Sequence, residues 1–586
     1  MNEPPAPLSP PPQPEENPVT PAKAYLGKAL FWDEQLSSNG TVACGTCHLP
    51  SAGGCDPRLI GDVPKPFHPG ADNLLGTEDD VVGSLGVSLH FDDGTYGTIT
   101  HFGCEPQVTG RKTPPSIDVA YANSLFWDGR AGNRFFDPDT GRVLIRGNGA
   151  LENQVMGPPV SDVEMGHVNR EWGEVVTRIA AARPLALAEA VPAALHSWIG
   201  DRTYPELFSE AFGTAEVTSA RIAMAIATYE RILYSDQTPL DVALRGGTPL
   251  TAQEQLGLEV FVENNCHACH EGGPLTDNGF RFIGIRPPDE DVGRFGETGN
   301  PDHLGEFRTP SLRNVALRPP YFHTGRFETL EDVVDFYLRG GDFDAPNKPG
   351  FIRPRNNVTA EERAALIAFL KRPLIDPRVE AGSAPFDPVI LYSQSDRVPQ
   401  IEGIGLAGSG GFEPRPIALE PPIAGSDNFT VAIAQGLGGA AAVLVVDDQD
   451  PGVTAQIPAQ AGFARREVTL QGTGEGQGYA SVNLTIDPSA SPSNGPYYGR
   501  WYVSDPAAPG GIAISKAFRF NTFRPANETW CGADIDMDLR TSVLDFATLV
   551  NETGDCPVPC AGDLNASGSV DQVDLLRAIS SWAACD

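Results

Sequence analysis

Two segments of the form Cys-x-x-Cys-His constrain the fold of this chain more than any other feature. They are Cys44-Gly-Thr-Cys47-His48 and Cys266-His-Ala-Cys269-His270. In such a segment both thiols bond to the vinyl groups of a haem, and the adjacent histidine becomes an axial ligand of the iron. A zinc site would need ligands from both distant segments, and a redox Cys-x-x-Cys pair needs no histidine. The sequence therefore predicts two covalently bound c-type haems, with His48 and His270 as iron ligands.

Composition excludes several classes of protein. The chain has 586 residues, of which 40% are hydrophobic and 20% charged, so it can bury several cores. Its 63 glycines and 54 prolines indicate many loops. The formal net charge of −34 repels phosphate backbones, so nucleic acid is not an expected partner. The longest apolar run, 437–446, is about half as long as a membrane helix, so no transmembrane segment is expected.

Haem c attachment and disulfide bonds both belong to exported proteins. The first residues, Met1-Asn-Glu-Pro-Pro-Ala-Pro, have neither the basic nor the apolar region of a signal peptide. We therefore expect a periplasmic or cell-surface protein whose signal peptide or anchor is removed or precedes the given start.

Five segments differ in character. We expect a Pro-rich leader that is disordered or polyproline, two mainly α, cytochrome c-like haem domains, an all-β sandwich and a small disulfide-bonded helical calcium-repeat module. Their ranges are 1–19, 20–235, 236–378, 379–529 and 530–586. The first haem domain is expected to be peroxidatic and the second to transfer electrons. The β assignment depends on short alternating runs between Gly, Pro, Asp and Ser clusters.

Three threonines mark expected helix starts in the haem domains. Thr20 precedes an apolar pattern, and capping boxes occur at Thr251-Ala-Gln-Glu254 and Thr359-Ala-Glu-Glu362. The box at Thr251 opens a helix that leads into the second haem segment. These helices around the haem segments are typical of small cytochrome c domains.

An internal repeat occupies the C-terminal segment, where Cys531 and Cys556 recur 29 residues later as Cys560 and Cys585. Each copy has oxygen-bearing side chains at alternating positions and a closing carboxylate, as calcium loops do. They are Asp534, Asp536, Asp538 and Asp545 in the first copy, and Asp563, Asn565, Ser567, Asp571 and Asp574 in the second. The stretch resembles a dockerin-type repeat, although Leu539 replaces a glycine in the first copy; the alternative is an acidic, solvated tail. The repeat favours the disulfides Cys531–Cys556 and Cys560–Cys585, which leaves Cys55–Cys104.

Residues 20–375 resemble the bacterial di-haem cytochrome c peroxidase and MauG superfamily. Several landmarks besides the haem segments carry this resemblance. They are Leu26-Gly-Lys-Ala-Leu-Phe-Trp32, Thr113-Pro114, Phe126-Trp127-Asp128-Gly129-Arg130, Gln154 and Glu164 around Gly157-Pro158, Phe307-Arg-Thr-Pro-Ser-Leu-Arg-Asn-Val315 and Pro320-Tyr-Phe-His323-x-Gly325.

The resemblance implies three roles near the first haem. Peroxide bound at the iron must lose a proton from one oxygen and gain one on the other as the O–O bond breaks, and a carboxylate can do both. By resemblance this general acid/base is Glu164, with Gln154 in the same pocket. Trp127 corresponds to the aromatic relay between the two haems. Without the motif, Glu164 would be read as a solvated loop residue and Trp127 as a core residue.

The second axial ligand of the second haem separates the subfamilies. Typical peroxidases of the group place a Met 14 residues after the His of Tyr-Phe-His-x-Gly, but here that position is Tyr337. MauG uses Tyr at this position. Phenolate favours higher iron oxidation states, whereas a Met thioether raises the reduction potential. The alternatives are that Tyr337 only packs, or that His303 is the ligand.

The chain departs from the family pattern in three places. The stretch 48–113 is longer than usual, and its extra histidines do not align with the loop histidine that ligates the first haem in the peroxidases, so structural or surface roles are expected for them. They are His68, His90 and His101. Residues 131–152 resemble an insertion. Lys112 stands where the family has an asparagine ligand of an inter-haem calcium, and its ammonium could replace that charge.

Three functions follow from the resemblance. The first is a MauG-like oxidase that uses hydrogen peroxide to oxidise a protein or peptide partner. The second is a peroxidase that removes hydrogen peroxide with electrons from a small cytochrome or cupredoxin. The third is a non-catalytic surface electron-transfer cytochrome. Tyr337 favours the first over the second, and Glu164 with Gln154 favours either enzyme over the third.

Overall fold

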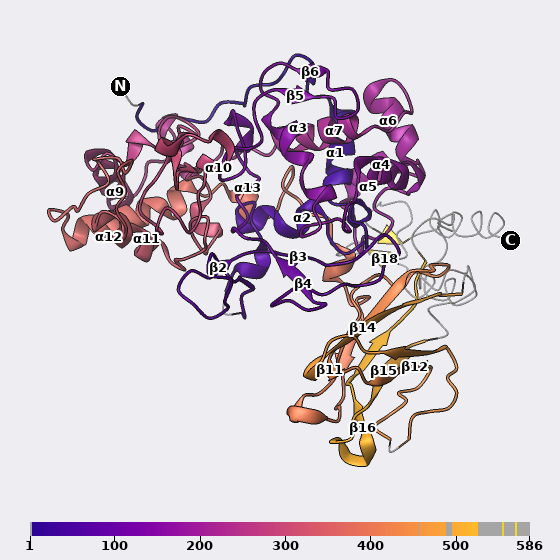
Figure 1. Cartoon of the computed structure of the whole chain (residues 1–586). Coiled ribbons are helices and arrows are strands. Elements are labelled where there is room, and N and C mark those ends of the chain that lie inside the picture. The colour runs from indigo at the N-terminus through magenta and orange to yellow at the C-terminus, as the bar shows by residue number, and fades with distance from the viewer. Residues whose placement is uncertain are drawn as a thin grey trace. The chain divides into compact units, whose positions relative to one another are not determined.

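The computed structural model describes residues 3–61, 63–454, 456–487 and 495–524, and the short strands β18 (Gly554–Asp555) and β19 (Ser569–Val570). The calcium loops expected in 530–586 and the disulfides Cys531–Cys556 and Cys560–Cys585 lie outside these residues. The chain divides into two compact units (Figure 1): residues 1–92 with 97–394, and residues 93–96 with 395–586. The multidomain organisation and the change from helices to antiparallel strands are therefore confirmed.

The first unit contains two helical lobes, each with its own apolar core. The core of the first lobe is formed by residues within 26–233 and 379–391, and that of the second by residues within 240–374. The helices of the first lobe are α1 (Pro21–Phe31), α2 (Cys44–Cys47), α3 (Ala150–Val155), α4 (Trp172–Ala181), α5 (Ala193–Ile199), α6 (Tyr204–Phe212) and α7 (Ser219–Arg231). Those of the second are α8 (Pro239–Leu244), α9 (Ala252–Glu263), α10 (Phe295–Thr298), α11 (Leu330–Leu338) and α12 (Ala360–Leu370). Helix α13 (Pro377–Glu380) follows them and packs Val379 into the core of the first lobe.

The helix starts expected from the sequence are confirmed. The hydroxyl of Thr20 accepts from Lys23 N at the start of α1. Both capping boxes form: the backbone N–H of Thr251 donates to Glu254 at 2.9 Å, and that of Thr359 donates to Glu362 at 2.7 Å. Helices α1 and α7 cross closely at Gly27, where a Cβ would lie 1.9 Å from the carbonyl oxygen of Ala225.

Short antiparallel ladders connect the helices of this unit. The pairs are β1 (Phe67–His68) with β2 (Val81–Val82), β3 (Leu85–Ser88) with β4 (Pro106–Val108), β5 (Phe135–Phe136) with β6 (Val143–Ile145), and β7 (Phe280–Arg281) with β8 (Phe307–Arg308). The first two pairs belong to the long stretch 48–113, and the third to 131–152. The segments that depart from the family pattern are thus built from small hairpins and loops.

The ends of the helical unit differ from the expected ranges. The leader is extended, but Leu8 and Asn17 are buried. Asn17 donates to Glu152 at 2.9 Å, and Leu8 N donates to Asp241 at 2.8 Å. At the other end, residues 379–394 belong to this unit and not to the β unit, because their apolar side chains pack into the first core. These side chains are Val379, Phe386, Val389 and Leu391.

The predicted Cys55–Cys104 disulfide is wrong, because both thiols are free. Cys55 is buried and its Sγ lies 3.4 Å from the carbonyl oxygen of Thr113, to which it donates. Cys104 is buried in the turn before β4. Elimination left these two cysteines as a pair, but the chain buries each thiol in separate surroundings.

The second unit is built from two antiparallel sheets that share one core. One sheet has the order β10 (Arg415–Ile417), β11 (Phe429–Gly438), β14 (Gly474–Leu484). The other has the order β13 (Ala464–Thr469), β12 (Ala441–Asp447), β15 (Tyr497–Ser504), β17 (Ala517–Phe520), β9 (Gln400–Glu402), with β16 (Ile512–Ile514) paired to β15. Trp501 of β15 is fully buried and donates to the carbonyl of Ala432 in β11 at 3.1 Å. The alternating runs seen in the sequence supply this core.

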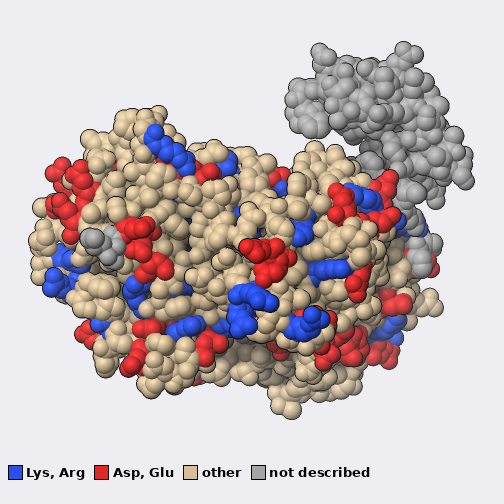
Figure 2. All heavy atoms as spheres, turned by 90° about the horizontal axis from the view of Figure 1, so that it is seen from above, with Lys and Arg blue, Asp and Glu red and all other residues tan. Residues whose placement is uncertain are grey.

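Acidic and basic side chains are interspersed on the face of the molecule drawn in Figure 2. Across the described residues, no helix is both long enough and apolar enough to cross a membrane.

Candidate functional site

The first Cys-x-x-Cys-His segment forms the short helix α2 and ends at His48. The Nδ1 of His48 lies 3.0 Å from the carbonyl oxygen of Gly54, to which it donates. This bond fixes the ring and leaves Nε2 as the nitrogen that can bind a metal, which is how ligating histidines are usually held. Gly45 packs against Trp32, whose ring would lie 2.2 Å from a Cβ at that position. The helix can therefore pack against Trp32 only with glycine there.

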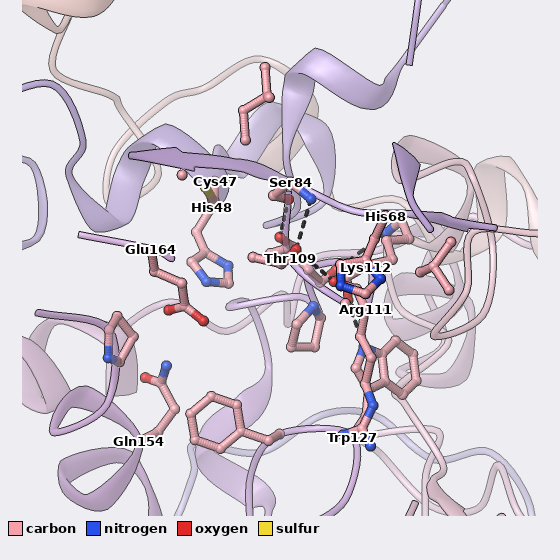
Figure 3. A pocket seen from close by; sticks show the side chains of 18 of the residues that line it. Cys47, His48, His68, Ser84, Thr109, Arg111, Lys112, Trp127, Gln154 and Glu164 are labelled. Atoms are coloured by element: carbon pink, nitrogen blue, oxygen red, sulfur yellow. Dashed lines mark hydrogen bonds between the residues drawn. The ribbon is translucent and has the colours of Figure 1, made fainter. Parts of the chain in front are cut away.

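A cavity of about 480 Å³ opens beside this segment. Both thiols and the His48 ring line it, and so do Glu164 and Gln154. Figure 3 shows the carboxyl group of Glu164 and the amide of Gln154 directed into the space that the His48 ring faces. Two thiols at thioether spacing, an imidazole with a free Nε2 and a cavity of small-molecule size fit a c-type haem.

Glu164 is a half-buried carboxylic acid in this cavity. Burial raises its pKa, and Arg130 opposes that rise. Among the described residues, none hydrogen-bonds to its carboxylate, so the group can exchange a proton with a bound molecule. Gln154, near the end of α3, adds an amide that can donate to or accept from the same molecule.

Trp127 lies where the two lobes of the helical unit meet. Its indole N–H donates to the carbonyl of Lys112 at 2.7 Å, and its own carbonyl accepts from Arg308 N at 2.8 Å. Its ring centroid lies 6.1 Å from that of His323, with 61° between the planes. His323 in turn stacks on Phe307 at 3.5 Å. Trp127 is thus held by residues of both lobes.

An arginine that the sequence analysis missed supports this arrangement. Arg111 lines the cavity and forms ion pairs with Asp128, the neighbour of Trp127, and with Asp291 of the second lobe. Neighbouring Lys112 is also buried, and its Nζ lies 3.4 Å from the carbonyl oxygen of Thr113. Within the described ranges, no group of three His, Cys, Asp or Glu side chains could hold a metal ion.

The second Cys-x-x-Cys-His segment follows helix α9. The Nδ1 of His270 lies 3.1 Å from the carbonyl oxygen of Leu275 and donates to it, the same arrangement as at His48. The segment therefore also fits a c-type haem, with Nε2 free for the iron. Tyr337 belongs to α11; burial and the neighbouring thiols Cys269 and Cys266 raise its pKa. The structure thus brings Tyr337 close to the second attachment site.

The three extra histidines of 48–113, and His303, the alternative ligand of the second haem, lie in different surroundings. His90 is buried and lies 2.6 Å from Ser38 Oγ and 2.7 Å from the carbonyl of Ser88; burial lowers its pKa to about 4. His101 is exposed. His303 has one ring nitrogen 2.9 Å from Thr298 Oγ1 and the other 3.4 Å from Asn300 Nδ2. Of the four, His68 lines the first cavity, and its Nδ1 accepts from Gly70 N at 3.3 Å.

A buried carboxyl group, Glu230, also lines the first cavity. It lies at the end of α7, its Oε2 has no hydrogen-bond partner in the described part of the chain, and burial raises its pKa to about 8. No motif marks this residue. The only sequence signal is a glutamate among the apolar residues of a helix that the fold surrounds.

Comparison with known proteins supports the expected family. The family model for di-haem cytochrome c peroxidase matches residues 21–249. The chain is 31% identical over 372 residues to the methylamine utilization protein MauG of Methylorubrum extorquens, covering 62% of this chain and 82% of that protein. It is 28% identical over 336 residues to the cytochrome c peroxidase Ccp of Escherichia coli (strain K12), covering 56% of this chain and 55% of that protein. The chain also matches the crystal structure of a MauG-like protein associated with microbial copper homeostasis, with 28% sequence identity and a TM-score of 0.46. The match covers 65% of this chain and 97% of that chain.

Proposed function

Because this chain belongs to the family of di-haem cytochrome c peroxidases and MauG, we propose that it reacts with hydrogen peroxide at the first haem and oxidises a protein or peptide partner. As a member of that family it is a haem-dependent oxidoreductase with two c-type haems. The finer proposal is that oxidising equivalents pass through Trp127 and a second, Tyr337-ligated haem. We place this activity in the periplasm or at the cell surface, where c-type haems are attached.

One observation carries the peroxide half of the proposal. The half-buried carboxyl of Glu164 faces the space onto which the His48 ring opens, and the described residues leave it without a hydrogen-bond partner. The haem iron supplies the redox-active position at which peroxide binds. Glu164 takes the proton from one peroxide oxygen and returns it to the other, while Gln154 orients the molecule.

The transfer half depends on Trp127 and Tyr337. Trp127 is an oxidisable ring fixed between the lobes by the carbonyl of Lys112 and the edge of His323. Tyr337 lies near the second pair of thiols and supplies an oxygen ligand of the kind that favours high oxidation states. A methionine there would instead suit a haem that is reduced by a small cytochrome or cupredoxin.

The test is absorption spectroscopy, from the visible to the near-infrared, on the fully ferric, haem-loaded protein before and after one equivalent of hydrogen peroxide. Rapid spectral change with a near-infrared inter-haem band supports the proposal. Reaction only after one haem has been reduced supports the detoxifying peroxidase instead. No reaction in either state supports an electron-transfer cytochrome.

A further inference from the structure

A second cavity, of about 900 Å³, adjoins the first on the side of Glu164. The two cavities share four lining residues, Phe126, Arg130, Pro158 and Glu164. The rest of the second cavity is lined mainly by residues 131–136 and 153–161, which include the start of the segment that resembles an insertion. Hydrogen peroxide has only two heavy atoms, whereas cavities of about 300–1,000 Å³ are typical of sites for larger organic ligands. This vestibule is therefore much larger than the oxidant requires.

Two arginine–aromatic pairs line the vestibule. The guanidinium carbon of Arg130 lies 3.5 Å from the ring centroid of Phe126, and that of Arg134 lies 5.4 Å from the ring centroid of Phe136. Arg130 is partly neutralised by Asp128 at 2.9 Å. Arg134 forms no ion pair with the carboxylates of the described residues, so its charge is free to bind an anion.

The Arg134 side of the vestibule is held in place before any ligand binds. Asn153 Nδ2 donates to the carbonyls of Gly132 and Arg134, each at 2.5 Å. Phe136 is 45% exposed in β5, so its ring can contact a ligand. Glu297 also lines the vestibule and repels anions, which favours the Arg134 side for a carboxylate. A guanidinium beside an exposed ring suits a ligand with a carboxylate on a flat apolar body.

We propose that the vestibule binds small aromatic carboxylates that carry a phenol group, and that these are reducing substrates at the first haem. The binding chemistry comes from Arg134 and Phe136, and the phenol is required because the ligand must give up an electron. In the overall reaction one hydrogen peroxide and two phenols give two waters and two phenoxyl radicals. Each phenol loses one electron and one proton. The two peroxide oxygens accept these two electrons and two protons as the O–O bond breaks, and each leaves as water. This inference rests on the proposed reaction with peroxide.

Binding is tested without turnover by equilibrium dialysis of the ferric, haem-loaded full chain against 3-(4-hydroxyphenyl)propionate and its neutral methyl ester. We expect the acid to bind more tightly than the ester. In Arg134→Gln the affinity for the acid should fall about tenfold or more, as for the loss of a charge-assisted hydrogen bond, with little change for the ester. The matched control is Arg142→Gln, an exposed arginine of the same hairpin that does not line the vestibule; it should bind the acid like the wild type.

Turnover then tests the second half of the inference. With peroxide, the acid should be oxidised with a lower KM than the ester, and Arg134→Gln should raise that KM selectively. Equal binding of acid and ester, or equal behaviour of the two arginine variants, overturns the inference. Peroxide reactivity is followed separately by the absorption change without any phenol. If the protein reacts with peroxide but binds the acid and the ester equally, only the vestibule inference is refuted. If it binds the acid but shows no absorption change with peroxide, the proposed function is refuted.

Discussion

Arg111 holds Asp291 through two parallel hydrogen bonds, from Nε to Oδ2 and from Nη2 to Oδ1, each 2.6 Å long. Its remaining nitrogen, Nη1, donates to Asp128 Oδ2 at 2.6 Å, directly beside Trp127. One side chain thus ties the segment that carries Trp127 to a loop of the second lobe. Only a planar guanidinium can make all three contacts at once.

We therefore expect Arg111→Lys to keep the charge but loosen Trp127. Electron transfer between the haems, measured by pulse radiolysis, should slow several-fold. The free energy of unfolding, measured in urea, should fall by about 1–3 kcal/mol. Arg339→Lys is the control, because Arg339 is an exposed arginine whose Asp342 partner is three residues away. Unchanged inter-haem transfer in Arg111→Lys would show that the clamp does not position Trp127.

The first attachment segment, Glu164, Gln154 and Trp127 could each be recognised from the sequence because each belongs to a local motif, and the fold brings these four to one cavity. It did not predict Arg111 with Asp291, since two residues 180 positions apart meet only after the lobes have packed. Glu230 was missed for a different reason: a glutamate in a helix reads as a solvated face until burial is known. The Cys55–Cys104 prediction failed because counting cysteines carries no information about distance.

Replacing Glu164 by Gln tests the proton transfer assigned to it. Gln keeps the shape but cannot accept and return a proton, so the rate of reaction with peroxide should fall by about 10²–10⁴. Haem content and the ferric spectrum should change little. Glu259→Gln, on the exposed face of α9, is the control. A full rate in Glu164→Gln would contradict both enzyme hypotheses.

Replacing Tyr337 by Phe tests the second axial ligand. Loss of an anionic oxygen ligand destabilises ferric iron, so the potential of the second haem should rise by on the order of 0.1 V or more, within the range of about 0.8 V that axial ligands span. Potentiometric titration followed by absorption measures this. Tyr321→Phe removes a hydroxyl from the core of the same lobe and serves as the control. Equal potentials in the two variants would mean that Tyr337 only packs.

Glu230 gives the fold a pH dependence whose direction can be worked out. Burial raises the pKa of its carboxyl from the usual value near 4.5 to about 8, against the opposing effect of Arg231. Below pH 4.5 the group is protonated in both the folded and the unfolded chain. Between pH 4.5 and pH 8 the unfolded chain releases this proton while the folded chain keeps it. The free energy of unfolding therefore falls as the pH rises through this range.

Glu230→Gln removes this dependence because the amide stays neutral. The variant should be more stable than the wild type at pH 8 by at least about 1.4 kcal/mol, the equivalent of one pKa unit, with a much smaller difference at pH 5. Urea unfolding of both haem-loaded proteins at the two pH values measures it. Buried Glu34, whose pKa is raised to about 7, also titrates in this range, but it is present in both proteins and cancels from the difference. Exposed Glu263→Gln should show no such difference. A gain in Glu230→Gln that is the same at pH 5 and pH 8 would mean that the carboxyl is ionised in the folded protein throughout.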